Sequence, residues 1–383
     1  MKSGTAPVEA RGEGKVGSAA MADRVLLDVT PLGSGHGARG IGTYLRGLMA
    51  GFRELGADRR PELLADAGQP LATGFESHLV RIPSWSVPRV PSPWPRYFGG
   101  RAVKRIAPKV FHATSPDLVP RAECLVVTCH DLIPLHFAKD YLAGPGRTPE
   151  RRAFDAYLKR LQRADRIIVP SLETRNDLVR DLGIESGRLR VVPHARLPQV
   201  FPAGATPVGP YVLYGGGVEP HKNAALTLEA LAATTSSVEL VVVGPWSPRR
   251  GERLRERARE VGVESRVHWL GYVPSARLAA LRQQAVAVLV PSHKEGFGFP
   301  VIEAMAARVP VIASDTPALR EVGGQAAIYR APDDPAGWAR MIDTLVGSPV
   351  MRRARSAAGA AQAARFSWTT AAEQTAAVYA ELL

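Results

Sequence analysis

Short apolar runs separated by longer amphipathic stretches set the pattern of this chain. The runs are rich in Val, Ile and Leu and are bounded by polar, Gly or Pro residues. Continuous apolar runs of this length are typical of strands that are buried on both faces of a parallel sheet. We expect these strands at 24–29, 110–113, 124–129, 165–169, 211–214, 239–244, 266–270, 286–290 and 309–313. The run 191–193 closes the first domain.

The intervening stretches show helical spacing of their apolar residues. Two of them are 147–161 and 172–182, and Ser171 before the second is a preferred N-cap residue. A third helix is expected at 367–383, with Ala and Val on one face. Strands alternate with helices on both sides of a Pro- and Gly-rich linker at 198–210. This pattern predicts an α/β fold with two Rossmann-like, doubly wound domains facing across a cleft.

The most informative stretch is 286–312, in which a predicted strand leads through a Gly-rich loop into a helix. Gly296 and Gly298 let the backbone approach a ligand closely, and the free N–H groups at the helix start favour a phosphate. Glu295 and Glu303 flank this anion site. A carboxylate beside a diphosphate is unfavourable unless it accepts hydrogen bonds from the hydroxyl groups of a sugar or ribose. Taken alone, a Gly-rich turn is also compatible with simple packing.

Glu295, the run Gly-Phe-Gly-Phe-Pro and the closing Glu-Ala-Met-Ala together resemble the donor signature of the family-four retaining glycosyltransferases. The resemblance implies that Glu295 holds hydroxyl groups of the transferred sugar. It places the donor diphosphate on the backbone amides of Gly296, Phe297 and Gly298, and it places the ribose on Glu303.

The resemblance covers roughly residues 24–383 and implies the GT-B architecture of two Rossmann-like domains. It implies an acceptor domain at 21–200 and a nucleotide-sugar donor domain at 201–366, with a helix at 367–383 packing back on the acceptor domain. Residues 1–20 are rich in Gly, Ala and Ser and lack the apolar segment of a secretory signal. We expect them to form a disordered extension.

A second Gly-rich loop opens the donor domain. Gly216 and Gly217 directly follow a predicted strand, and Lys222 and Asn223 precede a helix. A Lys at such a position can neutralise a diphosphate, and the resemblance assigns the donor phosphate to Lys222. Many family members carry an Arg where this chain has Gly217, so other groups must help to offset the phosphate charge.

The first domain offers a Gly-rich loop and two histidines. Gly40 and Gly42 precede a helix, in a loop that suits either a phosphate or a flexible connection. The resemblance implies that this loop faces the donor phosphates and the acceptor. His130 ends a strand in Val-Val-Thr-Cys-His-Asp-Leu-Ile-Pro-Leu, which resembles a family segment whose His lies beside the reacting sugar. His112 also ends a strand, and a lone His at such a position is more often a structural residue.

The segment around Tyr272 and Val273 resembles the family turn that borders the nucleobase, so these residues would line the base through backbone contacts. The opening Gly-Gly-Gly-Val-Glu-Pro-His-Lys-Asn looks more like mannosyltransferases than sucrose- or glycogen-type enzymes. GDP-mannose is therefore the first choice of donor and a UDP-sugar the second. The nucleotide-sugar is a co-substrate, and no further cofactor is expected.

The length, composition and cysteine content limit the classes of protein to which the chain can belong. The chain has 383 residues, 45% of them hydrophobic and 22% charged, as expected for a globular protein with two domains. Cys124 and Cys129 lie in or beside one strand, where extended backbone holds them too far apart for a disulfide. Two cysteines without a His array do not favour structural zinc. We expect a cytoplasmic protein, with peripheral contact at the inner membrane face as an open alternative.

The net charge of +13 is compatible with simple solvated faces, and it also suits an anionic substrate, membrane surface or nucleic acid. Residues 77–116 contain no Asp or Glu, and Arg, Lys and aromatic residues alternate there. This segment could form an ordinary connection and helix, or a surface for a phospholipid or anionic acceptor. A nucleic-acid partner is not favoured, because no nucleic-acid-binding motif is present.

The expected reaction is transfer of a sugar to an acceptor hydroxyl, glycan or lipid-linked, with retention at the anomeric carbon. Lys222 and the loop amides would stabilise the leaving diphosphate, and His130 and Glu295 would hold the reacting sugar. No Asp-x-Asp occurs in the chain, so a bound metal ion is not expected. Alternatives are a nucleotide-sugar epimerase on the same architecture and a non-catalytic nucleotide- or nucleic-acid-binding protein.

Overall fold

A computed structural model of the chain describes residues 25–34, 37, 40–68, 74–81, 98–116, 118, 120–142, 148–197 and 209–383. The expected N-terminal extension at 1–20, most of the expected linker at 198–210 and the central part of the basic segment at 77–116 lie outside these residues.

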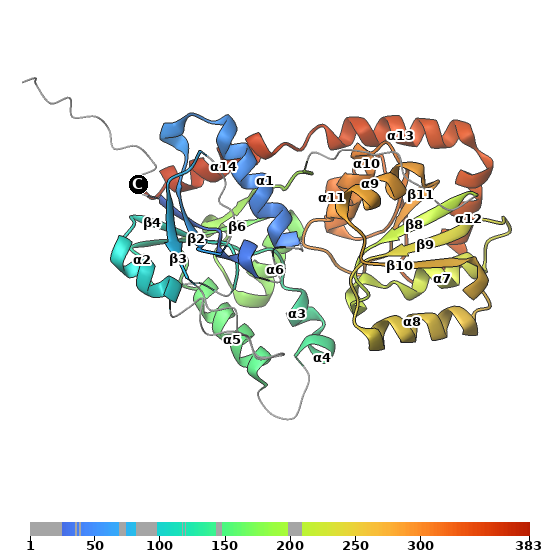
Figure 1. Cartoon of the computed structure of the whole chain (residues 1–383), viewed down its shortest axis with the longest axis horizontal. Coiled ribbons are helices and arrows are strands. Elements are labelled where there is room, and N and C mark those ends of the chain that lie inside the picture. The colour runs from blue at the N-terminus through green and yellow to red at the C-terminus, as the bar shows by residue number, and fades with distance from the viewer. Residues whose placement is uncertain are drawn as a thin grey trace, which may run out of the picture.

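Two all-parallel sheets, one in each half of the chain, form the two domains that lie side by side in Figure 1. The first sheet has the order β3-β2-β1-β4-β5-β6-β7. Its strands are β1 Val25–Asp28, β2 Glu62–Asp66, β3 Ser77–Val80, β4 Val110–Ala113, β5 Cys124–Thr128, β6 Arg166–Val169 and β7 Leu189–Val191.

The second sheet repeats this topology with the order β10-β9-β8-β11-β12-β13. Its strands are β8 Tyr211–Gly215, β9 Glu239–Val243, β10 Val267–Gly271, β11 Ala287–Val290, β12 Val311–Ser314 and β13 Ile328–Arg330. In both sheets the strand order reverses direction next to the first strand. The doubly wound α/β fold expected from the sequence is therefore confirmed.

Helices connect the parallel strands and cover the sheets (Figure 1). Those of the first domain are α1 Gly40–Glu54, α2 Gly100–Ile106, α3 Ile133–His136, α4 Ala138–Tyr141, α5 Pro149–Leu161 and α6 Leu172–Leu182. Those that follow are α7 Ala225–Ala232, α8 Pro248–Glu260, α9 Ser275–Gln284, α10 Phe299–Ala306, α11 Pro317–Gly323, α12 Pro335–Gly347, α13 Pro349–Ala363 and α14 Trp368–Ala380. Among the described residues, no helix has both the length and the hydrophobicity to span a bilayer.

Each sheet is buried on both faces, because successive side chains of a strand point to opposite sides. In β1, Leu27 packs with α1 and α14, whereas its neighbour Leu26 packs in a separate cluster with residues such as Leu161 of α5. The second sheet shows the same division, with Leu213 and Val212 in different clusters. This double burial explains why the strands have continuous apolar sequences.

The C-terminal helix α14 leaves the second domain and packs against α1 of the first (Figure 1). Two glycines of α1 make the close approach feasible. A Cβ atom at Gly47 would lie 1.9 Å from the Trp368 ring, and one at Gly51 would lie 2.0 Å from the Trp368 carbonyl oxygen. His112 is part of this packing, since its Nδ1 lies 2.7 Å from Tyr379 Oη and its Nε2 lies 2.7 Å from Thr128 Oγ1. The structure thus gives His112 a structural role.

Candidate functional site

The candidate donor site lies where the strand order of the second sheet reverses. Strands β8 and β11 are neighbours there, and their following loops leave in different directions. Such a point is where open α/β sheets bind ligands, at the carboxyl ends of the strands. A backbone hydrogen bond from His293 N to the His221 carbonyl oxygen, 2.8 Å long, joins the two loops. The topology therefore explains why the two Gly-rich segments of the second domain lie together.

Lys222 and Glu295 form an ion pair within this meeting point. Lys222 Nζ donates to both carboxylate oxygens of Glu295, each at 2.8 Å, and Ser292 Oγ donates to one of them at 2.7 Å. The Glu295 side chain is 8% exposed and that of Lys222 is 23% exposed. Burial disfavours the ionised Glu295 carboxyl, but the charge and hydrogen bonds of Lys222 outweigh burial and lower its pKa below the usual value.

The loop from Ser292 to Gly298, called the donor loop below, turns sharply before α10. Gly298 has φ +110°, a left-handed conformation that favours glycine, and α10 begins at Phe299, one residue before the expected Pro300. Pro300 has no N–H group, and Val301 N and Ile302 N donate to the Gly298 carbonyl oxygen, so the first turn of α10 can offer only the Phe299 N–H to an anion. Gly296 has no room for a side chain, because a Cβ atom there would lie 2.0 Å from the His130 carbonyl oxygen.

That contact brings the two domains together at the candidate site. His130 follows β5 of the first domain, and its Nε2 lies 3.1 Å from the Thr114 carbonyl oxygen, which assigns the ring proton to Nε2. Asp131, which sequence analysis did not single out, follows directly and accepts a hydrogen bond from Ile133 N at 2.9 Å. Burial raises the pKa of Asp131, with opposing contributions from Lys222 and Glu295. In the sequence, its position beside His130 at the end of a strand could have indicated a functional role.

Aromatic rings pack next to His130 between the domains. The His194 ring lies 5.7 Å from the His130 ring and 5.3 Å from that of Phe297. Tyr44 of α1 contacts both histidines, with centroid distances of 5.0 and 4.7 Å. His194 is buried, and neither of its ring nitrogens has a hydrogen-bond partner among the described residues. Burial therefore lowers its pKa well below the ordinary value.

Glu303 lies on α10 behind the donor loop and is bound by a residue that sequence analysis missed. Arg282 of α9 donates from Nη2 to Glu303 Oε2 at 2.6 Å, and its side chain is only 5% exposed. A buried Arg is normally paired, so its partner is held in a defined position. In the sequence, Arg282 directly follows the apolar run Leu-Ala-Ala-Leu, and this position was the feature that could have indicated a buried, paired Arg.

Three other predicted donor residues surround the site with backbone or packing roles. Tyr214 Oη donates to the Gly217 carbonyl oxygen, and a Cβ atom at Gly217 would collide with the Glu219 carboxylate. Gly216 packs its carbonyl oxygen against Gly244, where a Cβ atom would lie 1.9 Å away. The Asn223 side chain turns from the loop, since its Nδ2 donates to the Pro332 carbonyl oxygen at 2.8 Å.

The two residues predicted to border the nucleobase lie in the turn after β10. The Tyr272 side chain is 70% exposed, whereas Val273 is buried in the core of the second domain. Gly271 before them has φ +64° and allows the turn. The structure therefore places Tyr272 at the surface of the turn and Val273 in the core beneath it.

In the first-domain glycine loop, Gly40 and Gly42 start α1. A Cβ atom at Gly40 would meet the Phe299 ring at 3.9 Å, so this position lies against the start of α10 in the second domain. Gly42 packs on Gly37, whose carbonyl oxygen would lie 2.0 Å from an added Cβ atom. The structure brings Gly40 to the donor helix and gives Gly42 a packing role.

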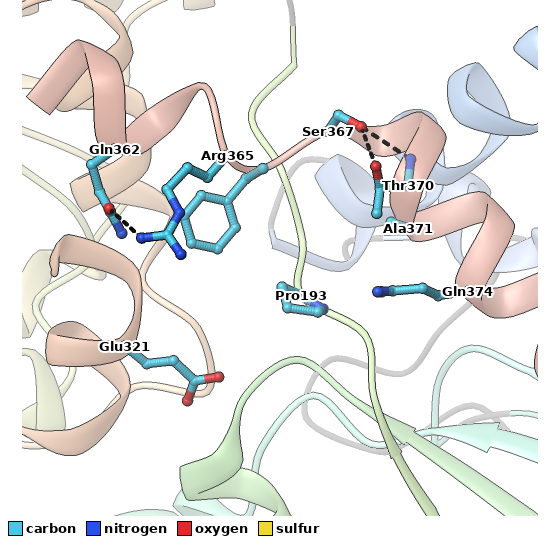
Figure 2. A pocket seen from close by; sticks show the side chains of 9 residues that line it. Pro193, Glu321, Gln362, Arg365, Ser367, Thr370, Ala371 and Gln374 are labelled. Atoms are coloured by element: carbon cyan, nitrogen blue, oxygen red, sulfur yellow. Dashed lines mark hydrogen bonds between the residues drawn. The ribbon is translucent and has the colours of Figure 1, made fainter.

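A cavity of about 250 Å³ lies at a different place, where the chain passes between the domains. Figure 2 shows the side chains around it, with Glu321 on one side and α14 on the other. Its lining comprises Pro193, Glu321, Gln362, Arg365, Phe366, Ser367, Thr370, Ala371 and Gln374. The predicted donor residues lie outside this lining, so the cavity belongs to the connection between the domains and not to the candidate donor site.

Among the described residues, one group of side chains has the spacing of a metal site, namely His136, Asp177 and Asp181. Its carboxylates are already held by cations. Arg180 donates to Asp177 at 2.6 Å, and Lys294 lies 2.8 Å from the other Asp177 oxygen. Two positive charges at these oxygens oppose binding of a divalent cation.

Comparison with known protein families accounts for both domains. Residues 38–195 match the family described as Glycosyltransferase Family 4. Residues 201–362 match the family described as Glycosyl transferases group 1. The two matches meet at the connection between the two sheets and include each of the loops described above.

Two curated proteins illustrate the similarity. The chain is 33% identical to a D-inositol 3-phosphate glycosyltransferase of Xylanimonas cellulosilytica, over 67% of this chain and 66% of that protein. It is 29% identical to O-antigen chain mannosyltransferase B of Escherichia coli, over 70% of this chain and 72% of that protein. The matched region thus spans about two thirds of the length of these relatives.

Solved structures show the same fold. Sucrose-phosphate synthase from Thermosynechococcus elongatus superposes with a TM-score of 0.74 at 20% identity, over 94% of this chain and 98% of that chain. HepE of Anabaena, in complex with UDP and glucose, superposes with a TM-score of 0.68 at 17% identity, over 94% and 99%. At such identities the likeness concerns the two-domain GT-B architecture alone.

Proposed function

The chain belongs to the group 1 and family 4 glycosyltransferases, and from this premise we propose that it transfers a sugar from a nucleotide-diphosphate sugar to an acceptor hydroxyl group. We propose that the reaction retains the configuration of the anomeric carbon and proceeds without a bound metal ion. The observation that supports this proposal most strongly is the Lys222–Glu295 ion pair. It lies at the donor loop, where Gly296 contacts His130.

In this proposal the charge of Lys222, the N–H groups of the donor loop and the Phe299 N–H at the start of α10 stabilise the leaving diphosphate. Preorganised donors of this kind stabilise charge that develops in the transition state without reorganising water. Glu295, released from Lys222, accepts hydrogen bonds from hydroxyl groups of the transferred sugar. His130 contributes its own hydrogen bond from the first domain.

The ribose of the donor would lie against Glu303, which Arg282 holds in place by a hydrogen bond. The nucleobase would contact the backbone of the turn at Tyr272 and Val273. In the transfer step, the acceptor oxygen forms a bond to the anomeric carbon while the bond to the diphosphate oxygen breaks. The acceptor proton passes to the departing phosphate, so the proposal needs no separate protein base.

GDP-mannose is the first choice of donor, supported by similarity to proteins described as O-antigen chain mannosyltransferases. A UDP-sugar is the second choice, because the structurally similar HepE is described in complex with UDP-glucose. The named relatives also suggest the acceptor class, a glycan or lipid-linked hydroxyl group in polysaccharide or glycolipid synthesis, or a small polyol phosphate. Work at the inner membrane face would fit a lipid-linked acceptor.

A thermal-shift screen against nucleoside diphosphates and nucleotide-sugars tests this function, because a ligand that binds only the folded chain raises its melting temperature. We expect a shift with GDP or UDP and their sugars. Turnover should then require an acceptor, and NMR of the product should show the anomeric configuration of the donor. A ligand converted to its epimer without an acceptor would identify an epimerase, and binding without turnover would identify a nucleotide-binding protein.

A further inference from the structure

Helix α6 of the first domain contacts the donor loop of the second through side-chain hydroxyl groups. Ser171, the N-cap residue of α6, donates from Oγ to the Gly296 carbonyl oxygen at 2.7 Å. Thr174, one turn into the helix, donates from Oγ1 to the same oxygen at 3.3 Å. Both hydroxyl groups belong to buried residues, so water does not compete freely for this carbonyl.

The carbonyl at Gly296 controls the direction of an amide in the candidate diphosphate loop. A peptide unit is planar and trans, so the C=O of one residue and the N–H of the next point in opposite directions. When Ser171 and Thr174 hold the Gly296 carbonyl toward α6, the Phe297 N–H is turned away from α6. The hydroxyl groups of one domain thereby set the orientation of a hydrogen-bond donor in the other.

Ion pairs hold the same part of α6 on the donor loop. Lys294 Nζ lies 2.7 Å from Glu173 Oε1 and 2.8 Å from Asp177 Oδ2. The three side chains are between 3% and 11% exposed, so salt screens these pairs weakly. Lys294 stands next to Glu295 in the chain, which links the ion pairs directly to the candidate site.

Each of two helix N-termini also receives a carboxylate from the other domain. Glu173 of α6 accepts a hydrogen bond from Ala318 N in α11, and Glu321 of α11 accepts one from Leu172 N in α6, both at 2.8 Å. The first N–H groups of a helix have no partner within the helix, so each bond satisfies an otherwise open donor. One hydrogen bond thus runs in each direction between α6 and α11, and together the two bonds fix how the N-termini of these helices align.

We propose that Ser171 and Thr174 are positioning residues for the donor: they fix the Gly296–Phe297 peptide so that its amide faces the donor diphosphate when the domains are docked. Donor affinity then depends on two hydroxyl groups of the first domain that hydrogen-bond to the donor loop and not to the diphosphate. This inference rests on the proposed function, since it assigns the Phe297 amide to a donor phosphate.

The test compares variants that lack a hydroxyl group at the Gly296 carbonyl with a control variant that lacks the N-cap hydroxyl of another helix. The variants are Ser171→Ala and Thr174→Val, and the control is Ser247→Ala, in which the lost hydroxyl caps α8 through Arg250 N. Removing an N-cap hydroxyl lowers the stability of either helix by a similar amount. Ser171→Ala and Thr174→Val each remove one of the two hydrogen bonds to the Gly296 carbonyl oxygen, and Ser247→Ala removes neither. Thr174→Ser keeps the hydroxyl group and serves as the conservative rescue.

The measurement is the affinity of the full chain for GDP and for UDP by calorimetry, at a temperature well below the melting point. We expect about tenfold weaker binding in Ser171→Ala and in Thr174→Val, the scale of one lost hydrogen bond. Ser247→Ala and Thr174→Ser should bind as the wild type does. Wild-type affinity in both deletion variants would overturn the inference alone. A wild-type chain that binds no nucleotide would overturn the proposed function and this inference with it.

Discussion

Lys222 donates to both carboxylate oxygens of Glu295 at 2.8 Å, although 73 residues separate them in the chain. The pair joins the loops that follow two neighbouring strands, β8 and β11. Each residue therefore satisfies the charge of the other while the donor is absent. In the proposed reaction a diphosphate takes the place of Glu295 as the partner of Lys222. Glu295 then becomes available to hydroxyl groups of the sugar.

Replacing Lys222 tests the charge at the leaving group. Lys222→Met should lower turnover much more than Lys159→Met on the exposed face of α5, because only Lys222 meets charge that grows in the transition state. The measurement is steady-state release of nucleoside diphosphate. Similar, small losses in the two variants would count against the assignment.

The same variant should be unstable for a separate reason. Lys222→Met leaves the Glu295 carboxylate buried without its cation, at a cost on the order of 3–5 kcal/mol in the free energy of unfolding. Adding Glu295→Gln removes the buried charge and should restore much of this stability without restoring turnover. Urea unfolding of the single and double variants measures the difference. A double variant no more stable than the single one would contradict a buried ion pair.

Variants of Glu303 test whether this residue binds the ribose of the donor. Glu303→Ala should weaken nucleotide-sugar binding, and it also leaves Arg282 without the carboxylate it contacts at 2.6 Å. Glu303→Gln keeps a hydrogen-bond acceptor and should weaken binding less. Calorimetry with the intact donor is the measurement. Donor affinity that stays unchanged in Glu303→Ala would remove the residue from the site.

His221 predicts a pH dependence of stability. Burial, with the nearby charge of Lys222, lowers its pKa to about 4, while Tyr141 lies 2.5 Å from its Nδ1. Below pH 6.5 the unfolded chain takes up a proton that the folded chain does not. Stability is therefore lost as the pH falls from 6.5 toward 4, by up to about 3 kcal/mol from this residue. His221→Gln should lose less stability than the wild type between pH 7 and pH 5, and equal losses would contradict the argument.

The absence of a metal requirement is also testable. Turnover should be unchanged in EDTA, because Lys222 and the loop amides are proposed to offset the diphosphate charge. The control is the same assay after addition of magnesium. Activity that EDTA abolishes and magnesium restores would show that these groups are insufficient.

The strands could be predicted from the sequence wherever they are buried on both faces. Strands β4, β5 and β8 have continuous apolar runs and were found within one residue of their bounds. Strands β2, β3 and β13 were missed. They lie at or next to sheet edges, where partly exposed residues such as Glu62, His78 and Arg330 interrupt the apolar pattern. Local patterns therefore identify central strands better than edge strands.

The candidate site was predicted in part for a related reason. Glu295 and the glycines that follow it form one continuous segment, so their chemistry is visible locally. The partners of these residues are distant in the chain. Arg282 reaches Glu303 from another helix, and Ser171 reaches Gly296 from the other domain, 125 residues earlier. Such contacts depend on how helices and domains pack, which single-sequence spacing does not encode.

A transfer site built from both domains is tested most directly by a comparison of turnover with nucleotide binding in His130→Ala. His130 comes from the first domain and contacts the donor loop through its backbone, while its ring is proposed to meet only the transferred sugar. Turnover should fall by about 100-fold, the scale of one lost transition-state contact. The calorimetric affinity for the bare nucleoside diphosphate, which lacks the sugar, should stay close to that of the wild type. Near-normal turnover in His130→Ala would contradict a transfer site built from both domains.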